Sequence, residues 1–319
     1  MSRRTLLLLR WGVFLLACLF LYVRLSRQQG DLDIVAMTQV FREPRTLLMI
    51  AVVSVLMLLN WGLESRKWRI LVCEVERISR WRAFMATLAG TPIGLITPNR
   101  VGEFVGRVLF LAPEHRIAAS FATALGSIAQ FVVTVVLGLL GLIALLFGAE
   151  HDRVSPAASA WVGLCALVAS VTVLLYFNPD LLRSAIARVP VIKRWERHAA
   201  VLGRFGNRML TRVLLISAAR YAVFSVQFAL LLGALADVAV ADALIAIPAV
   251  FLVSTLIPTV MLTELGVRGS VAVAFFATSA SNEEGVFMAS TVLWLINLGL
   301  PAMAGGVILL VARLRSARE

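Results

Sequence analysis

The amino-acid sequence predicts an all-α, polytopic membrane protein with about six spanning helices and two re-entrant broken hairpins. Of its 319 residues, 60% are hydrophobic and only 15% are charged, and the mean hydropathy is +0.91. Ordinary soluble domains are about 45–50% apolar and about 25% charged. This composition excludes a water-soluble fold, so the lengths of the apolar segments define the architecture.

Six apolar segments are long enough to cross a membrane, which takes roughly 20 helical residues. They cover residues 6–23, 46–63, 118–148, 160–177, 213–236 and 286–312. Two further apolar stretches, residues 83–111 and 244–280, are interrupted by prolines, glycines and charged residues. We expect each to be a re-entrant hairpin, although two short full crossings would satisfy the same count. Irregular backbone at membrane depth is tolerated only where it is buried in protein or lines a wet cavity.

The basic residues predict the orientation of the chain. It carries 30 Lys and Arg against 18 Asp and Glu, a formal charge of +12. Six of these bases lie in residues 64–82, eight in residues 178–212 and three in residues 313–318. By the positive-inside rule, both termini and the two basic loops lie in the cytoplasm of a cell-membrane protein. Residues 24–45 fit less well, because four arginines oppose three acids there in a loop that must lie outside.

Bases confined to short runs between apolar segments do not suit a nucleic-acid partner, which calls for a soluble basic domain. The three cysteines and three histidines predict neither a disulfide framework nor a metal site. We expect no cofactor and no catalytic residue, because the spans lack histidine and any cluster of Asp or Glu. A membrane-embedded enzyme acting on lipid is therefore the least favoured class.

The two halves of the chain contain the same order of elements. Residues 1–148 run span, polar loop, span, broken hairpin, span, and residues 160–315 repeat that order from the opposite side of the membrane. The sequence thus predicts an inverted repeat. Inverted repeats with discontinuous helices are typical of secondary transporters, in which the broken segments form the binding site.

The two broken stretches also carry matching charged residues. Each has a proline, a glutamate five or six residues later, and an arginine four residues after the glutamate. These residues are Pro98, Glu103 and Arg107 in the first stretch, and Pro258, Glu264 and Arg268 in the second. Residues four apart on a helix share a face and can pair. An ionisable group at membrane depth costs at least ~2.5 kcal/mol, so it points to function by default.

We expect the arginines of these stretches to hold a lipid phosphate through bidentate hydrogen bonds, with the glutamates holding the arginines in place. The candidate substrate-binding residues are Arg100, Glu103, Arg107, Arg220, Glu264 and Arg268, and the candidate hinge residues are Pro98, Gly102, Pro258 and Gly266. In the alternative interpretation, the pairs neutralise each other and pin the hairpins together. A second alternative is a non-transporting scaffold that binds anionic lipid through the basic loop 178–212.

Other polar and aromatic residues in or near the spans have simpler interpretations. For Asn60, Gln130 and Asn297 we expect hydrogen bonds between helices, each worth about 1 kcal/mol. Trp61, Trp68 and Trp81 flank the first basic loop and are interpreted as an interfacial aromatic belt.

Residues 97–107 resemble a motif of the flippase-like integral membrane family that includes the membrane region of lysylphosphatidylglycerol synthase. The family element is Pro-Gly/Ser-Arg-Ile/Val-Gly-Glu followed by an arginine, and it is matched here at Pro98, Arg100, Gly102, Glu103 and Arg107. The resemblance covers nearly the whole chain. It implies movement of lipids, anionic or aminoacylated, between the leaflets of the membrane.

The sequence departs from that family pattern in two places. Thr263 and Glu264 replace a glycine pair in the second hairpin, and residues 126–130 lack a charged Glu-Arg element. These departures imply a substrate different from that of the best-known member. No soluble aminoacyl-transfer domain follows the second repeat, so we do not expect lipid synthesis by that route.

Overall fold

The computed structural model describes residues 43–95, 97, 100–147, 156–188, 196–257 and 261–316, and these residues form helices joined by turns and short loops, with no strand among them. The predicted span 6–23 and the prolines Pro98 and Pro258 lie outside this part of the chain. The longer helices are α3 (Pro44–Val72), α4 (Arg80–Leu95), α6 (Arg116–Phe147), α7 (Pro156–Phe177), α10 (Asn207–Leu235), α11 (Val240–Leu256), α12 (Met261–Phe276), α13 (Glu283–Trp294) and α14 (Leu300–Ser316). The shorter ones are α5 (Gly102–Val108), α8 (Pro179–Ala187) and α9 (Glu196–Ala199).

Five segments are long and apolar enough to cross a membrane. They are Pro44–Val72, Pro113–Leu146, Ser159–Phe177, Asn207–Leu235 and Glu283–Val311. Each contains or largely overlaps a span predicted from the sequence, so the multi-pass all-α class is confirmed. The total of six spans and the inverted repeat stay predictions.

Exposed apolar side chains recur at helical spacing along the outer helices. On α7, four large side chains at intervals of three or four residues are 46–61% exposed; they are Leu164, Leu167, Val171 and Leu174. On α14, Met303, Val307 and Leu310 are exposed in the same way. Contiguous apolar surface of this kind marks contact with a partner or a membrane. These side chains are suited to contact with the hydrocarbon of a bilayer, and a helix is stable there because it satisfies its own backbone hydrogen bonds.

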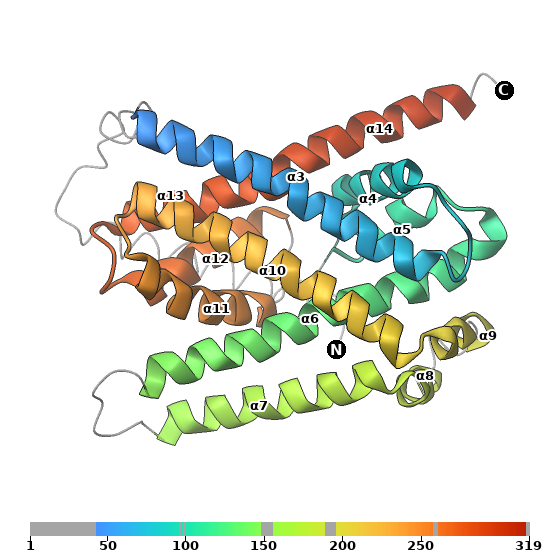
Figure 1. Ribbon diagram of the computed structural model, residues 1–319, viewed down its shortest axis with the longest axis horizontal. Coiled ribbons are helices and arrows are strands. Elements are labelled where there is room, and N and C mark those ends of the chain that lie inside the picture. Colours follow the sequence, from blue (N-terminus) through green and yellow to red (C-terminus); the bar gives the residue numbers. More distant parts are fainter. Residues whose placement is uncertain are drawn as a thin grey trace, which may run out of the picture.

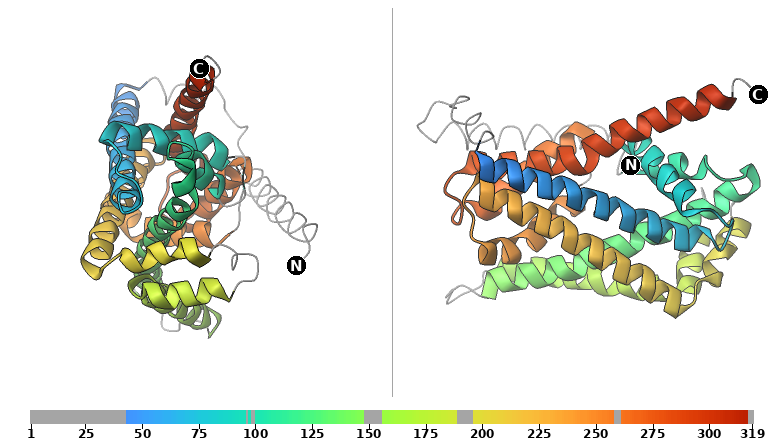
Figure 2. Two further views of the ribbon diagram at one scale, coloured as in Figure 1. Left: turned by 90° about the vertical axis from the view of Figure 1, so that its right-hand side faces the viewer. Right: turned by 45° about the horizontal axis from the view of Figure 1, so that its top comes forward.

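Two helix pairs lie at opposite ends of the long spanning helices, as Figure 1 and the right-hand view of Figure 2 show. One pair is α4 and α5, from the first broken stretch, and the other is α11 and α12, from the second. Each stretch therefore folds into two helices separated by a break, as the sequence predicts. The break in the second stretch precedes α12, which continues unbroken through Gly266, so Gly266 is not itself the point of the break.

The first pair packs backbone against backbone. A Cβ atom added to Gly106 of α5 would lie 2.5 Å from Cα of Gly90 on α4, and one added to Gly94 would lie 2.3 Å from Cγ of Glu103. Small residues spaced four apart on facing helices permit this approach in membrane proteins. The close contact brings the charged side chains of α5 against α3.

We predict that Gly106→Leu separates α4 from α5. Because the new side chain would meet backbone atoms, the cost should exceed the usual overpacking range, at about 3 kcal/mol or more. The thermal midpoint of the detergent-solubilised protein should fall by about 6 °C or more. Gly163→Leu is the matched control, because Gly163 is exposed on α7 and a Cβ there meets no atom within 4 Å. Equal midpoints for the two variants would contradict this packing.

Glu76 joins the turn after α3 to the turn before α6. Its carboxylate accepts a hydrogen bond from the Ala112 amide at 2.9 Å and lies 3.3 Å from Arg82 Nη1 and 3.2 Å from His115 Nδ1. Burial alone would raise the pKa of Glu76, but the Ala112 amide, His115 and Arg82 together hold that pKa below its ordinary value. The contact closes the end of the molecule at which α4 begins and α5 ends.

Candidate functional site

Eight charged side chains gather where the two broken stretches meet the long helices α3 and α10. We call this group the buried charge network; its members are Glu64, Lys67, Arg100, Glu103, Arg107, Arg220, Glu264 and Arg268. All six substrate-binding candidates from the sequence belong to it. Glu64 and Lys67 were not among those candidates.

Glu64 of α3 is the shared acceptor of the network. Its carboxylate accepts from Arg107 Nη1 at 2.6 Å, lies 2.8 Å from Lys67 Nζ and accepts from Arg220 Nη1 of α10. Its side chain is only 6% exposed. A carboxylate this deeply buried is stable only when paired and hydrogen-bonded, and here three cations from three helices surround it.

The two Glu–Arg pairs expected from the sequence both form. Arg107 Nη2 donates to Glu103 at 2.8 Å on α5, and Arg268 Nη2 donates to Glu264 at 3.1 Å on α12. Arg268 also lies over the ring of Phe224, with its guanidinium carbon 5.6 Å from the ring centroid. The i, i+4 spacing therefore predicted the local geometry of both stretches.

Arg100 joins one broken stretch to the other. Its Nε lies 3.3 Å from Glu264 Oε2, and its Nη1 lies 3.7 Å from Glu103 Oε1. The backbone of Arg100 has φ 58°, in the left-handed region that non-glycine residues rarely adopt. Strain of this kind costs of order 1–3 kcal/mol and persists where the surroundings enforce it, often at functional sites.

The backbone around this break is held by Thr97. Its hydroxyl accepts from the Gly102 amide at 2.7 Å and donates to the Gly94 carbonyl at 3.0 Å. Gly102 is the first residue of α5, so the break ends there. Thr97 thereby bridges the last turn of α4 and the start of α5, and it positions Arg100 between them.

Uncharged polar side chains surround Arg220 on α10. Its Nε donates to Asn60 Oδ1 at 3.0 Å and its Nη1 donates to Gln130 Oε1 at 3.2 Å. Asn60 in turn donates to Asn297 at 3.2 Å. Asn297 lies in a short π-helical turn, Leu295–Gly299, of the kind that often occurs at functional sites. The expectation of hydrogen bonds between helices is confirmed for Asn60, Gln130 and Asn297.

Formally, the network has five cations and three carboxylates, a charge of +2. Several arginine donors in it also have no acceptor among the described residues, although they are buried. These donors are Arg100 Nη2, Arg107 Nε and Arg268 Nε. Buried donors without a partner are costly, and an excess of buried positive charge is costlier. The arrangement therefore suits an anion with several acceptor oxygens.

The structure corrects two expectations about the region that follows the second span. Residues 64–72 were assigned to a cytoplasmic loop, but α3 continues through them to Val72. Its 29 residues measure about 43 Å, longer than a hydrocarbon core of about 30 Å. Two charged residues of this continuation, Glu64 and Lys67, are buried in protein instead of lying in water.

The tryptophan belt is the second correction. Trp61 and Trp68 are 5% and 1% exposed, and they donate to Asn297 O and Thr123 Oγ1 at 3.1 and 2.9 Å. Their ring N–H groups thus connect helices inside the protein. Trp81, at 69% exposure, is the one of the three that faces outward.

The long apolar helices, their lipid-facing rows and this enclosed ionic cluster define a multi-pass helical membrane protein. Among the residues that the structure describes, no three or more His, Cys, Asp and Glu side chains gather so as to hold a metal ion. The chain belongs to the family described as the lysylphosphatidylglycerol synthase TM region, whose family model matches residues 7–316. The resemblance seen at residues 97–107 is therefore confirmed over nearly the whole chain. A comparison with curated proteins finds no match.

Proposed function

We propose that this protein moves a phosphate-bearing, anionic lipid between the leaflets of the cell membrane, without a covalent step. The observation that carries the proposal is the formal charge of +2 in the buried charge network, together with its unpartnered arginine donors. A lipid phosphate supplies both the negative charge and the acceptor oxygens that this network lacks. Arginine suits the task because its planar fork binds phosphate in a bidentate manner.

In the proposed mechanism, carboxylates hold the arginines until a phosphate replaces them. Glu103 holds Arg107, and Glu264 holds both Arg268 and Arg100. A phosphate that enters the network takes over these donors, so the contact between Arg100 and Glu264 opens. Since that contact links the two broken stretches, its opening frees one stretch to move relative to the other.

The arrangement of the broken stretches agrees with such a transporter. They lie at opposite ends of the long helices (Figure 1) and meet at the contact between Arg100 and Glu264, as we expect for alternating access around a fixed site in the predicted inverted repeat. We propose that both stretches are re-entrant and that both termini are cytoplasmic. The family description names lysylphosphatidylglycerol. This lipid carries the phosphate on which the proposal relies, although its lysyl group makes its net charge positive.

A translocation assay in proteoliposomes tests this function. Fluorescent phosphatidylglycerol and phosphatidylcholine are incorporated separately, and dithionite quenching reports the lipid that reaches the outer leaflet. We expect faster quenching of the anionic probe with the wild type, and a rate about tenfold lower with Arg268→Gln, because one charge-assisted hydrogen bond is lost. Arg77→Gln, at an exposed position outside the network, is the control.

The assay also separates this function from a scaffold role. A scaffold would leave both probes at the rate of protein-free vesicles, in the wild type as well as in the variant. Equal rates for wild type and Arg268→Gln, both above that of protein-free vesicles, would show that lipid moves by a route that does not use the network.

A further inference from the structure

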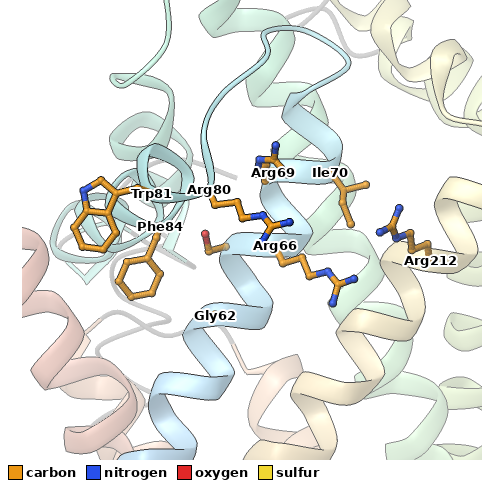
Figure 3. Close-up of a pocket in the computed structure, with 9 residues that line it drawn as sticks. Gly62, Arg66, Arg69, Ile70, Arg80, Trp81, Phe84 and Arg212 are labelled. Atoms are coloured by element: carbon orange, nitrogen blue, oxygen red, sulfur yellow. The ribbon is translucent and has the colours of Figure 1, made fainter.

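A separate pocket of about 610 Å³ lies on the far side of α3 from Glu64. Four arginines line it: Arg66 and Arg69 from α3, Arg80 from α4 and Arg212 from α10. Figure 3 shows Arg80 extending from α4 toward α3, with Arg66 and Arg212 on the adjacent helices. We call this the four-arginine pocket. From the sequence these residues were interpreted only as positive-inside charges of the two basic loops.

No acidic residue in the part of the chain that the structure describes pairs with the cations of the four-arginine pocket. None of its nine lining residues is acidic, and no described carboxylate forms an ion pair with any of the four arginines. Arg69 Nε donates to the Ile78 carbonyl at 2.9 Å, which fixes that side chain against the turn after α3. Four cations converging on one concave surface attract an anion, and arginine favours phosphate over a single point charge.

The opposite wall of the pocket is aromatic. Trp81 and Phe84 of α4 stack with ring centroids 6.0 Å apart, and Trp81 is 69% exposed. Figure 3 places both rings together, away from Arg66 and Arg212. Exposed tryptophan is enriched at the level of lipid headgroups. A ligand with a phosphate at one end and an apolar chain at the other therefore matches both walls.

We infer that the four-arginine pocket binds the phosphate of an anionic phospholipid, with the aromatic wall covering the start of its acyl chains. The pocket opens beside the ends of α3, α4 and α10, which the charge distribution assigns to the cytoplasmic leaflet. Its volume is within the range of small-molecule sites, about 300–1,000 Å³. The ligand is thus a lipid of that leaflet that carries net negative charge.

This inference does not rest on the proposed translocation. The four arginines and the aromatic pair are not members of the buried charge network, and binding at the pocket requires no movement of the broken stretches. Arg268→Gln should slow translocation and leave binding at the pocket within about twofold of wild type. The translocation assay and the binding assay can therefore each refute one proposal without refuting the other.

A label at Gly62 reports binding at this pocket alone. Gly62 lines the pocket, and a Cβ added there meets no atom within 4 Å. A trifluoromethyl group is attached to Gly62→Cys in full-length protein whose Cys18, Cys73 and Cys165 are replaced by serine. Its ¹⁹F resonance in micelles is followed during titration with dihexanoyl phosphatidic acid, dihexanoyl phosphatidylcholine or inorganic phosphate.

We expect a saturable shift with phosphatidic acid, at a concentration about tenfold or more below that needed for either other ligand. The double variant Arg66→Gln/Arg212→Gln should raise the midpoint about tenfold or more, since two charge-assisted hydrogen bonds are lost. Trp81→Ala should weaken the binding of phosphatidic acid and leave the binding of inorganic phosphate unchanged. Arg208→Gln is the matched control, because Arg208 is exposed on α10, the helix of Arg212, but lies outside the pocket; it should change the midpoint less than about twofold.

Three results would overturn the inference. An unchanged midpoint in the double arginine variant would show that Arg66 and Arg212 do not hold the ligand. Equal midpoints for phosphatidic acid and phosphatidylcholine would show that the pocket does not select for negative charge. Inorganic phosphate binding as tightly as the lipid, with no effect of Trp81→Ala, would assign the pocket to a free anion.

Discussion

Replacing Glu64 with glutamine should destabilise the folded protein by about 3–5 kcal/mol, the usual cost of removing one partner from a buried ion pair. The carboxylate is the shared acceptor of Arg107, Arg220 and Lys67, so a neutral amide leaves three cations close together without the charge that balances them. We expect the thermal midpoint of unfolding, measured in detergent, to be lower than that of the wild type by about 6 °C or more.

The matched control for this substitution is Glu114→Gln. Glu114 is an exposed carboxylate of the turn before α6 and makes no contact with the network. It should leave the midpoint within about 1 °C, as surface substitutions do. A Glu64→Gln midpoint as high as that of the control would contradict the role of Glu64 as the central acceptor.

The second large effect is expected from exchanging the charges of Arg100 and Glu264. Arg100→Glu lowers the formal charge of the network from +2 to zero, and Glu264→Arg raises it to +4. We expect each single variant to translocate phosphatidylglycerol about tenfold more slowly or worse, which corresponds to about 1.4 kcal/mol or more in the barrier. The double variant restores both the pairing and the charge of +2, so it should recover most of the rate.

The exchange is measured by the quenching rate in proteoliposomes made from protein that elutes as a single species. Recovery separates an interaction between the two residues from independent effects of each substitution. A double variant as slow as the slower single variant would show that the two side chains do not act through their contact.

Local patterns in the sequence predicted the local geometry well. The four-residue spacing of Glu103 and Arg107, and of Glu264 and Arg268, correctly predicted one pair on α5 and one on α12. Apolar length predicted the five described spans, because lipid imposes a minimum length on any spanning helix. These properties depend only on neighbouring residues and on the solvent.

The centre of the network was missed because it depends on contacts between distant segments. Glu64 is 43 residues from Arg107 and 156 from Arg220, and no local spacing relates them. The density of charge after Leu63 also suggested a loop, although helix α3 continues to Val72. One signal was available: Glu64 directly follows an apolar run, and Lys67 comes three residues later, at helical spacing.

The four-arginine pocket illustrates the same limit. Arg66 and Arg69 were counted as loop residues, whereas they lie in the last turns of α3 and line one pocket with Arg80 and Arg212. Composition predicted that these charges lie at the cytoplasmic face. Only the packing of α3 beside α4 and α10 shows that they converge on one concave surface.

The most direct test of lipid passage through the network is to lock the two broken stretches together. Arg100→Cys/Glu264→Cys, in a chain without its native cysteines, removes one cation and one carboxylate and so keeps the formal charge of +2. A short bifunctional methanethiosulfonate joins the two thiols, and dithiothreitol releases them. Translocation is followed by extraction of fluorescent phosphatidylglycerol with albumin, on one proteoliposome sample before and after reduction. We expect the locked protein to show the rate of protein-free vesicles and the reduced protein to show a rate well above it. Equal rates in both states would contradict lipid passage through the network.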